Sequence, residues 1–196
     1  MTYAIYTIGY SGFTVDEFLD ALISHKVNAV IDVRSNPFSE YKPEYNKPAL
    51  ELLLKKKNIY YRNYANEFGA RQEDRKFFNE GGYLDFEKFS ESKQFQEGVK
   101  RLCEAMKKGY TFALMCAEKH PLNCHRAILV ARAFHERGIK VIHIMPGGND
   151  ITHEELEELM LGTDSRQGDL FMSREELIRQ AYIKRNKEIG WRQEQE

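Results

Sequence analysis

The segment Cys116–Arg126 contains the densest group of reactive side chains in the sequence. It reads Cys-Ala-Glu-Lys-His-Pro-Leu-Asn-Cys-His-Arg, so two thiols, a carboxylate, two imidazoles and a guanidinium lie close along the chain. A helix is expected to begin near Cys124, and the free N–H groups at a helix start favour anions and thiolates. A cation such as Arg126 opposes the helix dipole at that position. We therefore expect a negative partner for Arg126, which would be Asp32, Glu118 or a bound anion.

Three kinds of chemistry could use this segment. An enzyme for a phosphate-bearing substrate would hold the anion with several arginines and would use a carboxylate as acid or base. A thiol enzyme would use Cys116 or Cys124 as a nucleophile or as a redox pair. The cysteine-phosphatase template does not fit, because Arg126 follows Cys116 by ten residues, which is too far for that loop. A metal centre is the third option.

The candidate metal ligands are Cys116, His120, Cys124 and His125, all of them suitable for zinc or iron. Their spacings of four, four and one residues are not a common zinc pattern. The adjacent Cys124 and His125 are also expected to diverge on a helix. We therefore assign no metal ligands, leave the cofactor unknown with none predicted, and keep a divalent metal as an alternative.

Polar side chains also follow the other expected strands. Because ligands of parallel α/β sheets bind beyond the carboxyl ends of the strands, these side chains are expected to share one site. The predicted catalytic residues are Asp32, Cys116 and Glu118. The predicted substrate- or anion-binding residues are Ser11, Arg34, Tyr41, Arg71, Cys124, His125 and Arg126.

Two segments bear on nucleotide recognition. The loop over residues 34–46 places Tyr41 beside Lys42, and such pairs can stack on bases and bind phosphates, although they are also common in packed surface loops. Asp32 lies where dinucleotide enzymes place a ribose-binding acid. However, the first turn reads Gly9-Tyr-Ser-Gly12 and lacks the G-x-G-x-x-G fingerprint. A nicotinamide dinucleotide fold is therefore rejected.

The elements that must position these residues alternate between strand and helix. Strands are expected over residues 3–8, 29–33, 59–64, 111–116 and 140–144. Helices are expected after Thr14, over 48–57, 93–108 and 124–137, and after Thr152 and Ser173. Each of those three hydroxyl residues is followed three positions later by a glutamate, as in a capping box.

This alternation predicts one α/β domain over residues 1–196. The expected architecture has three α/β/α layers around a five-stranded, mainly parallel, doubly wound (Rossmann-like) sheet. An incomplete barrel is the alternative. The core is expected over about 3–146 and the C-terminal helices over about 152–188, with a polar link at Gly162–Asp169.

Composition limits the classes of function. With 29 basic and 30 acidic residues the net charge is −1, so a broad polyanion-binding surface is not indicated. No apolar run approaches the roughly 20 residues that span a bilayer, and no signal peptide is visible. We therefore expect a cytoplasmic protein without membrane contact, either a monomer or a homodimer. Its three cysteines are expected to be reduced thiols, with Cys103 in the core.

The motifs resemble those of the DUF488 proteins, a bacterial and archaeal family of unknown function. They are Thr7-Ile-Gly-Tyr-Ser11, Asp32-Val-Arg34 with the proline and tyrosine loop after it, Gly69-Ala-Arg71, and Cys116-Ala-Glu118 leading to Cys124-His-Arg126. They span about residues 3–146. The chain departs from the family pattern at Tyr10, where histidine is frequent, and at Ala70, where glycine is frequent. The resemblance implies an α/β fold and a set of site residues, and it implies no activity.

We expect an enzyme acting on a phosphorylated substrate, either a nucleotide or a nucleic acid, at the carboxyl ends of the strands. One alternative is a non-catalytic module that binds a nucleotide or nucleic acid in the same place. The other is a thiol redox or metal site formed through Cys116 and Cys124.

Overall fold

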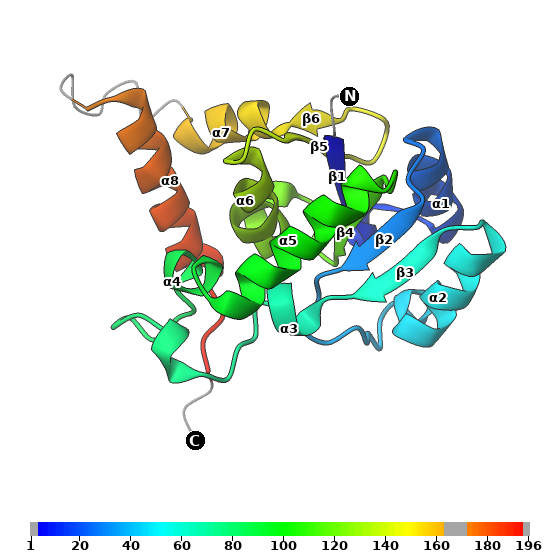
Figure 1. The fold of residues 1–196 in the computed structure, drawn as a ribbon, viewed down its shortest axis with the longest axis horizontal. Coiled ribbons are helices and arrows are strands. Elements are labelled where there is room, and N and C mark those ends of the chain that lie inside the picture. Colours follow the sequence, from blue (N-terminus) through cyan, green and yellow to red (C-terminus); the bar gives the residue numbers. More distant parts are fainter. Residues whose placement is uncertain (1–3, 163–171, 194–196) are drawn as a thin grey trace.

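The computed structural model describes residues 4–162 and 172–193. A six-stranded sheet lies at its centre, with the strand order β3-β2-β4-β1-β5-β6 (Figure 1). The strands are β1 (Ala4–Gly9), β2 (Ala29–Asp32), β3 (Tyr60–Asn63), β4 (Phe112–Cys116), β5 (Lys140–Ile144) and β6 (Ile151–Thr152). The first five pair in parallel, and β6 is antiparallel to β5. The α/β class and the parallel sheet are thus confirmed.

The number of strands differs from the prediction of five. The additional strand β6 has only two residues, directly before a helix, and two residues are too few to show the alternation that marks a strand. Its antiparallel direction follows from a short connection after β5, because parallel strands need a longer crossover.

The helices lie between and after the strands. The α-helices are α1 (Val15–Ser24), α2 (Lys47–Lys56), α3 (Ala65–Phe68), α4 (Phe86–Ser90), α5 (Lys93–Lys107), α6 (Arg132–His135), α7 (His153–Leu161) and α8 (Arg174–Ile189). Short 3-10 turns occur at η1 (Tyr10–Gly12), η2 (Pro43–Tyr45), η3 (Arg75–Phe77) and η4 (Pro121–Asn123). A π-helix, η5 (Arg126–Ala131), runs directly into α6.

Two apolar clusters, one on each face of the sheet, pack the sheet between two layers of helices. Side chains of β4 alternate between them: Phe112 and Leu114 join one cluster, and Ala113 and Met115 join the other. The second cluster includes residues of α1 and α2, and the first includes residues of α4, α5 and the π-helix. Both faces of the sheet are therefore covered, as the sequence predicted.

Two of the predicted capping boxes are confirmed in full. At α1 the Thr14 hydroxyl accepts from the Glu17 backbone N–H, and the Glu17 carboxylate accepts from the Thr14 N–H. Thr152 and Glu155 repeat this arrangement at α7. At α8 the hydroxyl of Ser173 accepts from the third helical N–H. Apart from Gly162, the predicted link at Gly162–Asp169 lies outside the described residues.

The predicted helix over 124–137 differs in form from what the structure shows. Cys124 is extended, with φ −140° and ψ 130°, and the helix begins only after it. The first part is the π-helix, and the α-helical part ends at His135. None of the helices in the described part of the chain is long and apolar enough to cross a membrane.

Candidate functional site

The ends of β1, β2 and β4 meet at one edge of the sheet. Gly9 is level with Cys116 in the β1–β4 pair, and Asp32 is level with Met115 in the β2–β4 pair. A cavity of about 370 Å³ opens beyond this edge, and we call it the strand-end pocket. Its lining consists of Tyr10, Arg34, Ser35, Asn36, Phe38, Ser39, Ala70, Arg71, Cys116, Ala117, Glu118, Asn123, His125, Ile189 and Trp191.

A buried ion pair lies at the wall that β2 contributes. Asp32 is fully buried and accepts from the Arg34 guanidinium at both oxygens, from Nε at 2.9 Å and from Nη2 at 2.6 Å. The Tyr61 hydroxyl donates to the same carboxylate at 2.6 Å. Nη2 of Arg34 also donates to the Tyr45 carbonyl. The carboxylate is thus occupied by protein donors and is not part of the pocket lining.

The remaining nitrogen of Arg34 is different. Arg34 is 5% exposed, and its Nη1 has no hydrogen-bond partner among the described residues. The guanidinium lies 5.2 Å from the ring centroid of Tyr10, whose ring stacks on Tyr45 at 4.4 Å. Because a buried donor without an acceptor costs about 1–3 kcal/mol, an acceptor from outside the chain would be stabilising here.

A second group joins the end of β4 to the start of the π-helix. Ligand atoms of Cys116, Cys124 and His125 all lie within 4.8 Å of one another, and the three residues are buried. The prediction that Cys124 and His125 diverge is wrong, because it assumed that Cys124 is helical. Cys124 is extended instead, and the ligand atoms of both residues lie within 4.8 Å of Cys116 Sγ at the end of β4. His120 is not a member of this group; its Nδ1 accepts from the Leu122 N–H at 3.3 Å.

Hydrogen bonds fix the orientation of this cluster. His125 Nε2 donates to the Val33 carbonyl at 3.0 Å, so in the neutral ring Nδ1 carries the lone pair, 3.9 Å from Cys116 Sγ. Cys124 Sγ accepts from the Arg126 backbone N–H at 3.4 Å. In its thiol form Cys124 Sγ donates to Glu118 Oε2 at 2.9 Å.

The electrostatics distinguish the two thiols. A hydrogen bond to Cys124, together with burial, raises the pKa of Cys116 well above its usual value. Burial would also raise the pKa of Cys124, but the hydrogen bond from Cys116 and the charge of Arg126 outweigh it and lower that pKa well below its usual value. Burial and the neighbouring Cys124 raise the pKa of Glu118. The cluster therefore favours one thiolate, at Cys124.

Arg126 lies behind the pocket and not in its lining. It is fully buried, and its guanidinium donates to the carbonyls of Glu118 at 2.5 Å and Lys119 at 3.3 Å. Gly9 permits this packing, because a side chain there would overlap the Glu118 carbonyl. In place of the negative partner that we expected, the Arg126 guanidinium thus has the backbone carbonyls of Glu118 and Lys119.

The structure brings together only part of the predicted site. Arg34, Arg71, Cys116, Glu118 and His125 line the pocket. Asp32, Cys124 and Arg126 support it from behind. Ser11 and Tyr41 are not among the lining residues: the Ser11 backbone N–H donates to the Ala117 carbonyl, and Tyr41 is 95% exposed.

Several lining residues were not predicted. Ser35, Asn36 and Phe38 belong to the loop that sequence analysis singled out for its length. Ile189 and Trp191 come from the end of α8 and the segment after it, which lies far away in the sequence. The one sequence feature that could have indicated this part of the pocket lining is Trp191, the single tryptophan of the chain.

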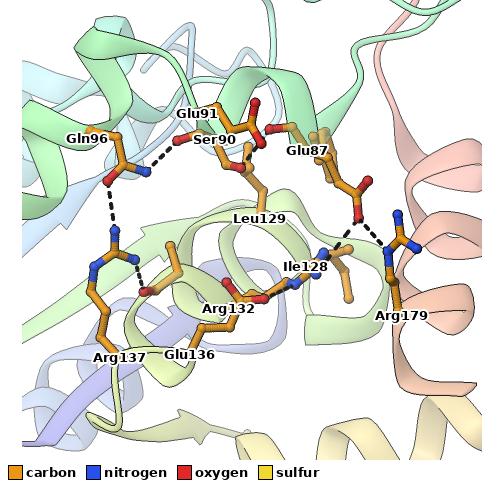
Figure 2. A pocket seen from close by; sticks show the side chains of 12 residues that line it. Glu87, Ser90, Glu91, Gln96, Ile128, Leu129, Arg132, Glu136, Arg137 and Arg179 are labelled. Carbon is orange, nitrogen blue, oxygen red and sulfur yellow. Dashed lines mark hydrogen bonds and ion pairs between the residues drawn. The ribbon is translucent and has the colours of Figure 1, made fainter. Parts of the chain in front are cut away.

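A second cavity of about 430 Å³ lies between α4, α6 and α8. Arg132, Arg137 and Arg179 line it, and Figure 2 shows each of them directed at an acceptor within the protein. Arg132 and Arg179 reach Glu87, Arg132 also reaches Glu136, and Arg137 donates to Gln96. These arginines already have partners within the protein, whereas Nη1 of Arg34 in the strand-end pocket has none among the described residues. The strand-end pocket is therefore the stronger candidate for a ligand site.

Comparisons with known proteins identify a family. Residues 14–133 match the family model described as "Domain of unknown function DUF488". The match includes β2, β3, β4 and the cysteine cluster, while the motif at Thr7–Ser11 precedes it. No curated protein and no solved structure matches the chain.

Proposed function

This chain belongs to the DUF488 family, and from that premise we propose that it is an enzyme that binds a phosphate-bearing substrate in the strand-end pocket and acts on it by acid–base catalysis. The substrate would be a nucleotide or the end of a nucleic acid. A cavity of about 370 Å³ is within the usual range for small-molecule sites.

The observation that carries this proposal is the unpaired Nη1 of Arg34. The rest of that guanidinium is fixed by Asp32 and Tyr45, so the free nitrogen is held in place before any ligand arrives. A phosphate oxygen would supply the missing acceptor through a charge-assisted hydrogen bond. Preorganisation of this kind lowers the entropic cost of binding.

Arg71 adds a second positive charge to the pocket. Its backbone N–H donates to Ser35 Oγ at 2.8 Å, which fixes the loop, while its side chain is exposed along the pocket wall. No acidic side chain of residues 4–162 or 172–193 forms an ion pair with Arg71. Phe38 and Trp191 line the same pocket and offer flat surfaces on which a base could stack.

Glu118 is the acid–base candidate. It is the single carboxylate in the pocket lining among the described residues. Its carboxyl group is held beside Cys124, and its backbone carbonyl is held by Arg126. The proposal includes a cytoplasmic location, where the thiols around Glu118 stay reduced.

Thermal unfolding with a ligand panel tests the binding step. Inorganic phosphate, nucleotides, short oligonucleotides and the matching nucleosides would be compared. A ligand at 100 times its Kd adds about 2.7 kcal/mol, or several degrees in Tm at about 2–4 °C per kcal/mol. We expect phosphate-bearing ligands to raise Tm and nucleosides to leave it unchanged.

Arginine variants locate that binding. Arg71→Ala should weaken phosphate binding about tenfold or more, since a charge-assisted hydrogen bond contributes about 1.5–3 kcal/mol. Arg75→Ala is the matched control, because Arg75 is exposed nearby and does not line the pocket. A panel in which no phosphate compound raises Tm would refute the proposal.

Turnover of the ligands that bind tests the catalytic step. Glu118→Gln should lower kcat by about 10²–10⁴-fold and leave binding intact. Products would be followed by mass spectrometry. Saturable binding with no product from the wild-type chain would instead support the non-catalytic binding module.

A further inference from the structure

The three-residue cluster at the end of β4 has the composition of a transition-metal site. Two thiols and one imidazole are the ligands that zinc prefers, and they come from Cys116, Cys124 and His125. They are brought together from both ends of the connection between β4 and the π-helix. Sequence spacing argued against a metal, whereas the positions of the ligand atoms favour one.

The distances fit one ion. With Zn–S about 2.3 Å and Zn–N about 2.0 Å, sulfur and nitrogen ligands of a tetrahedral zinc lie about 3.5 Å apart. Cys116 Sγ and His125 Nδ1 are 3.9 Å apart, and no pair of ligand atoms in the cluster exceeds 4.8 Å. Small side-chain rotations are therefore enough to close the ligands around an ion.

The surroundings of the cluster orient its ligands. Ligating histidines usually donate their other ring N–H to a carbonyl or carboxylate, which fixes the tautomer. His125 Nε2 does so to Val33 O at 3.0 Å, which leaves Nδ1 free toward Cys116. The N–H of Arg126 donates to Cys124 Sγ at 3.4 Å and would support the charge of a bound thiolate.

The pocket determines where a further ligand would enter. Cys116 and His125 line the strand-end pocket, and Cys124 lies behind them. Glu118 also lines the pocket, with Oε2 at 2.9 Å from Cys124 Sγ. Three protein ligands beside an open pocket are typical of catalytic zinc, whereas structural sites have four protein ligands.

We propose that Cys116, Cys124 and His125 bind one zinc ion whose fourth position opens into the strand-end pocket beside Glu118. The ion would supply a Lewis acid next to the phosphate held by Arg34. Its part in a reaction rests on the function proposed above, but its binding does not.

Metal content of the full chain tests this site. Protein purified under reducing conditions from zinc-supplemented cells should carry about one zinc ion per chain by mass spectrometry of the elements. Cys124→Ser and His125→Ala should lose it. Cys103→Ser and His120→Ala are controls of the same residue types outside the cluster, and they should retain it.

Cobalt gives a second measurement on the wild-type chain, which does not depend on whether a variant folds. After zinc is removed with a chelator, added Co²⁺ should produce thiolate-to-cobalt absorption that saturates at one equivalent. A small anion such as azide should change that spectrum by binding at the open position.

A folded, reduced wild-type chain with neither zinc nor this absorption would overturn the proposal. A cobalt spectrum that azide does not change would reject the open position. A metal-free chain that cycles between dithiol and disulfide would also overturn it, in favour of a redox pair.

The two proposals fail separately in these experiments. Bound zinc without any stabilisation by phosphate would keep the metal site and reject the proposed substrate. Stabilisation by phosphate in a chain that never binds metal would keep the proposed substrate class and reject the metal site. Arg71→Ala should lose phosphate binding and keep its zinc, because Arg71 is not a member of the cluster.

Discussion

Asp32 shows how a single residue can matter to a site without entering it. Its type and position at the end of β2 led to the prediction of a catalytic acid or base, and that role stays a prediction. In the structure its two oxygens accept from Arg34 and Tyr61 in a fully buried setting. These bonds fix the guanidinium, and its Nη1 has no hydrogen-bond partner among the described residues. The geometry favours a positioning role.

Asp32→Asn should therefore destabilise the protein strongly. The amide cannot accept both bonds from Arg34, and it leaves the charge of that guanidinium buried and uncompensated. Removing one partner of a buried ion pair costs about 3–5 kcal/mol, which urea unfolding would measure. Asp74→Asn, in the exposed pair with Lys76, is the control and should change stability little. Equal effects of the two substitutions would contradict this role of the buried pair.

At the scale of elements, the helix starts were predictable and the cysteine connection was not. A capping box is local, since Thr14 and Glu17 satisfy each other's backbone donors within one turn. The conformation of the segment between β4 and α6 depends instead on contacts with residues far away in the sequence. Cys124 is extended and the following residues form a π-helix, held by contacts with β1 and Val33. No short sequence pattern predicts that geometry.

Thr14→Ala should lower the free energy of unfolding by about 1 kcal/mol, because the Glu17 backbone N–H at the start of α1 loses its acceptor and the Glu17 carboxylate loses the bond from the Thr14 hydroxyl. Thr14→Ser keeps the hydroxyl and should stay close to the wild type. Thermal and urea unfolding of the two variants would measure the difference. If serine were as destabilising as alanine, the hydroxyl would not be the source of the effect.

At the scale of the whole molecule, a buried chain of hydrogen bonds joins the sheet to the C-terminal helices. The Thr7 hydroxyl donates to His143 Nδ1 at 2.8 Å, and His143 Nε2 donates to His153 Nδ1 at 3.0 Å. His153 Nε2 donates to the Tyr182 oxygen, whose hydroxyl donates to Glu157. The chain runs from β1 through β5 and α7 to α8. The two links that a histidine Nδ1 accepts require that histidine to be neutral.

This chain makes stability depend on pH. Burial, with the nearby charges of His135 and Arg132, lowers the pKa of His153 from 6.5 to about 3. The unfolded chain then binds the proton more readily than the folded one. The stability from neutral His153 is therefore complete above pH 6.5 and is lost as the pH falls from there toward 3.

We expect a loss of about 2 kcal/mol between pH 6.5 and 4.5, since the slope is half of its full value of about 1.4 kcal/mol per unit at the unfolded pKa and approaches that full value below it. Urea unfolding across this range would measure it. His153→Gln is neutral at every pH and should reduce the slope, leaving the part due to His143, whose pKa burial also lowers. An unchanged slope in the variant would contradict the assignment to His153.

The sequence alone determined the features that depend on short-range physics. Alternating apolar runs and capping residues indicated the α/β class, the parallel strands and most helix starts, because each signal lies within one element. The rule for parallel sheets also put Arg34, Cys116 and Glu118 at a common edge.

Only the tertiary structure decided which of these residues line the pocket and which partners they contact. Strand order put β4 between β2 and β1, so that Arg34 and Cys116 line the same pocket. Arg126 was expected to bind an anion, but it is buried behind the pocket and its guanidinium donates to two backbone carbonyls. The extended Cys124 brought two thiols and an imidazole together, and the end of α8 supplied Trp191. These outcomes depend on contacts between residues far apart in the chain, and no local pattern encodes them because packing alone determines which side chains meet.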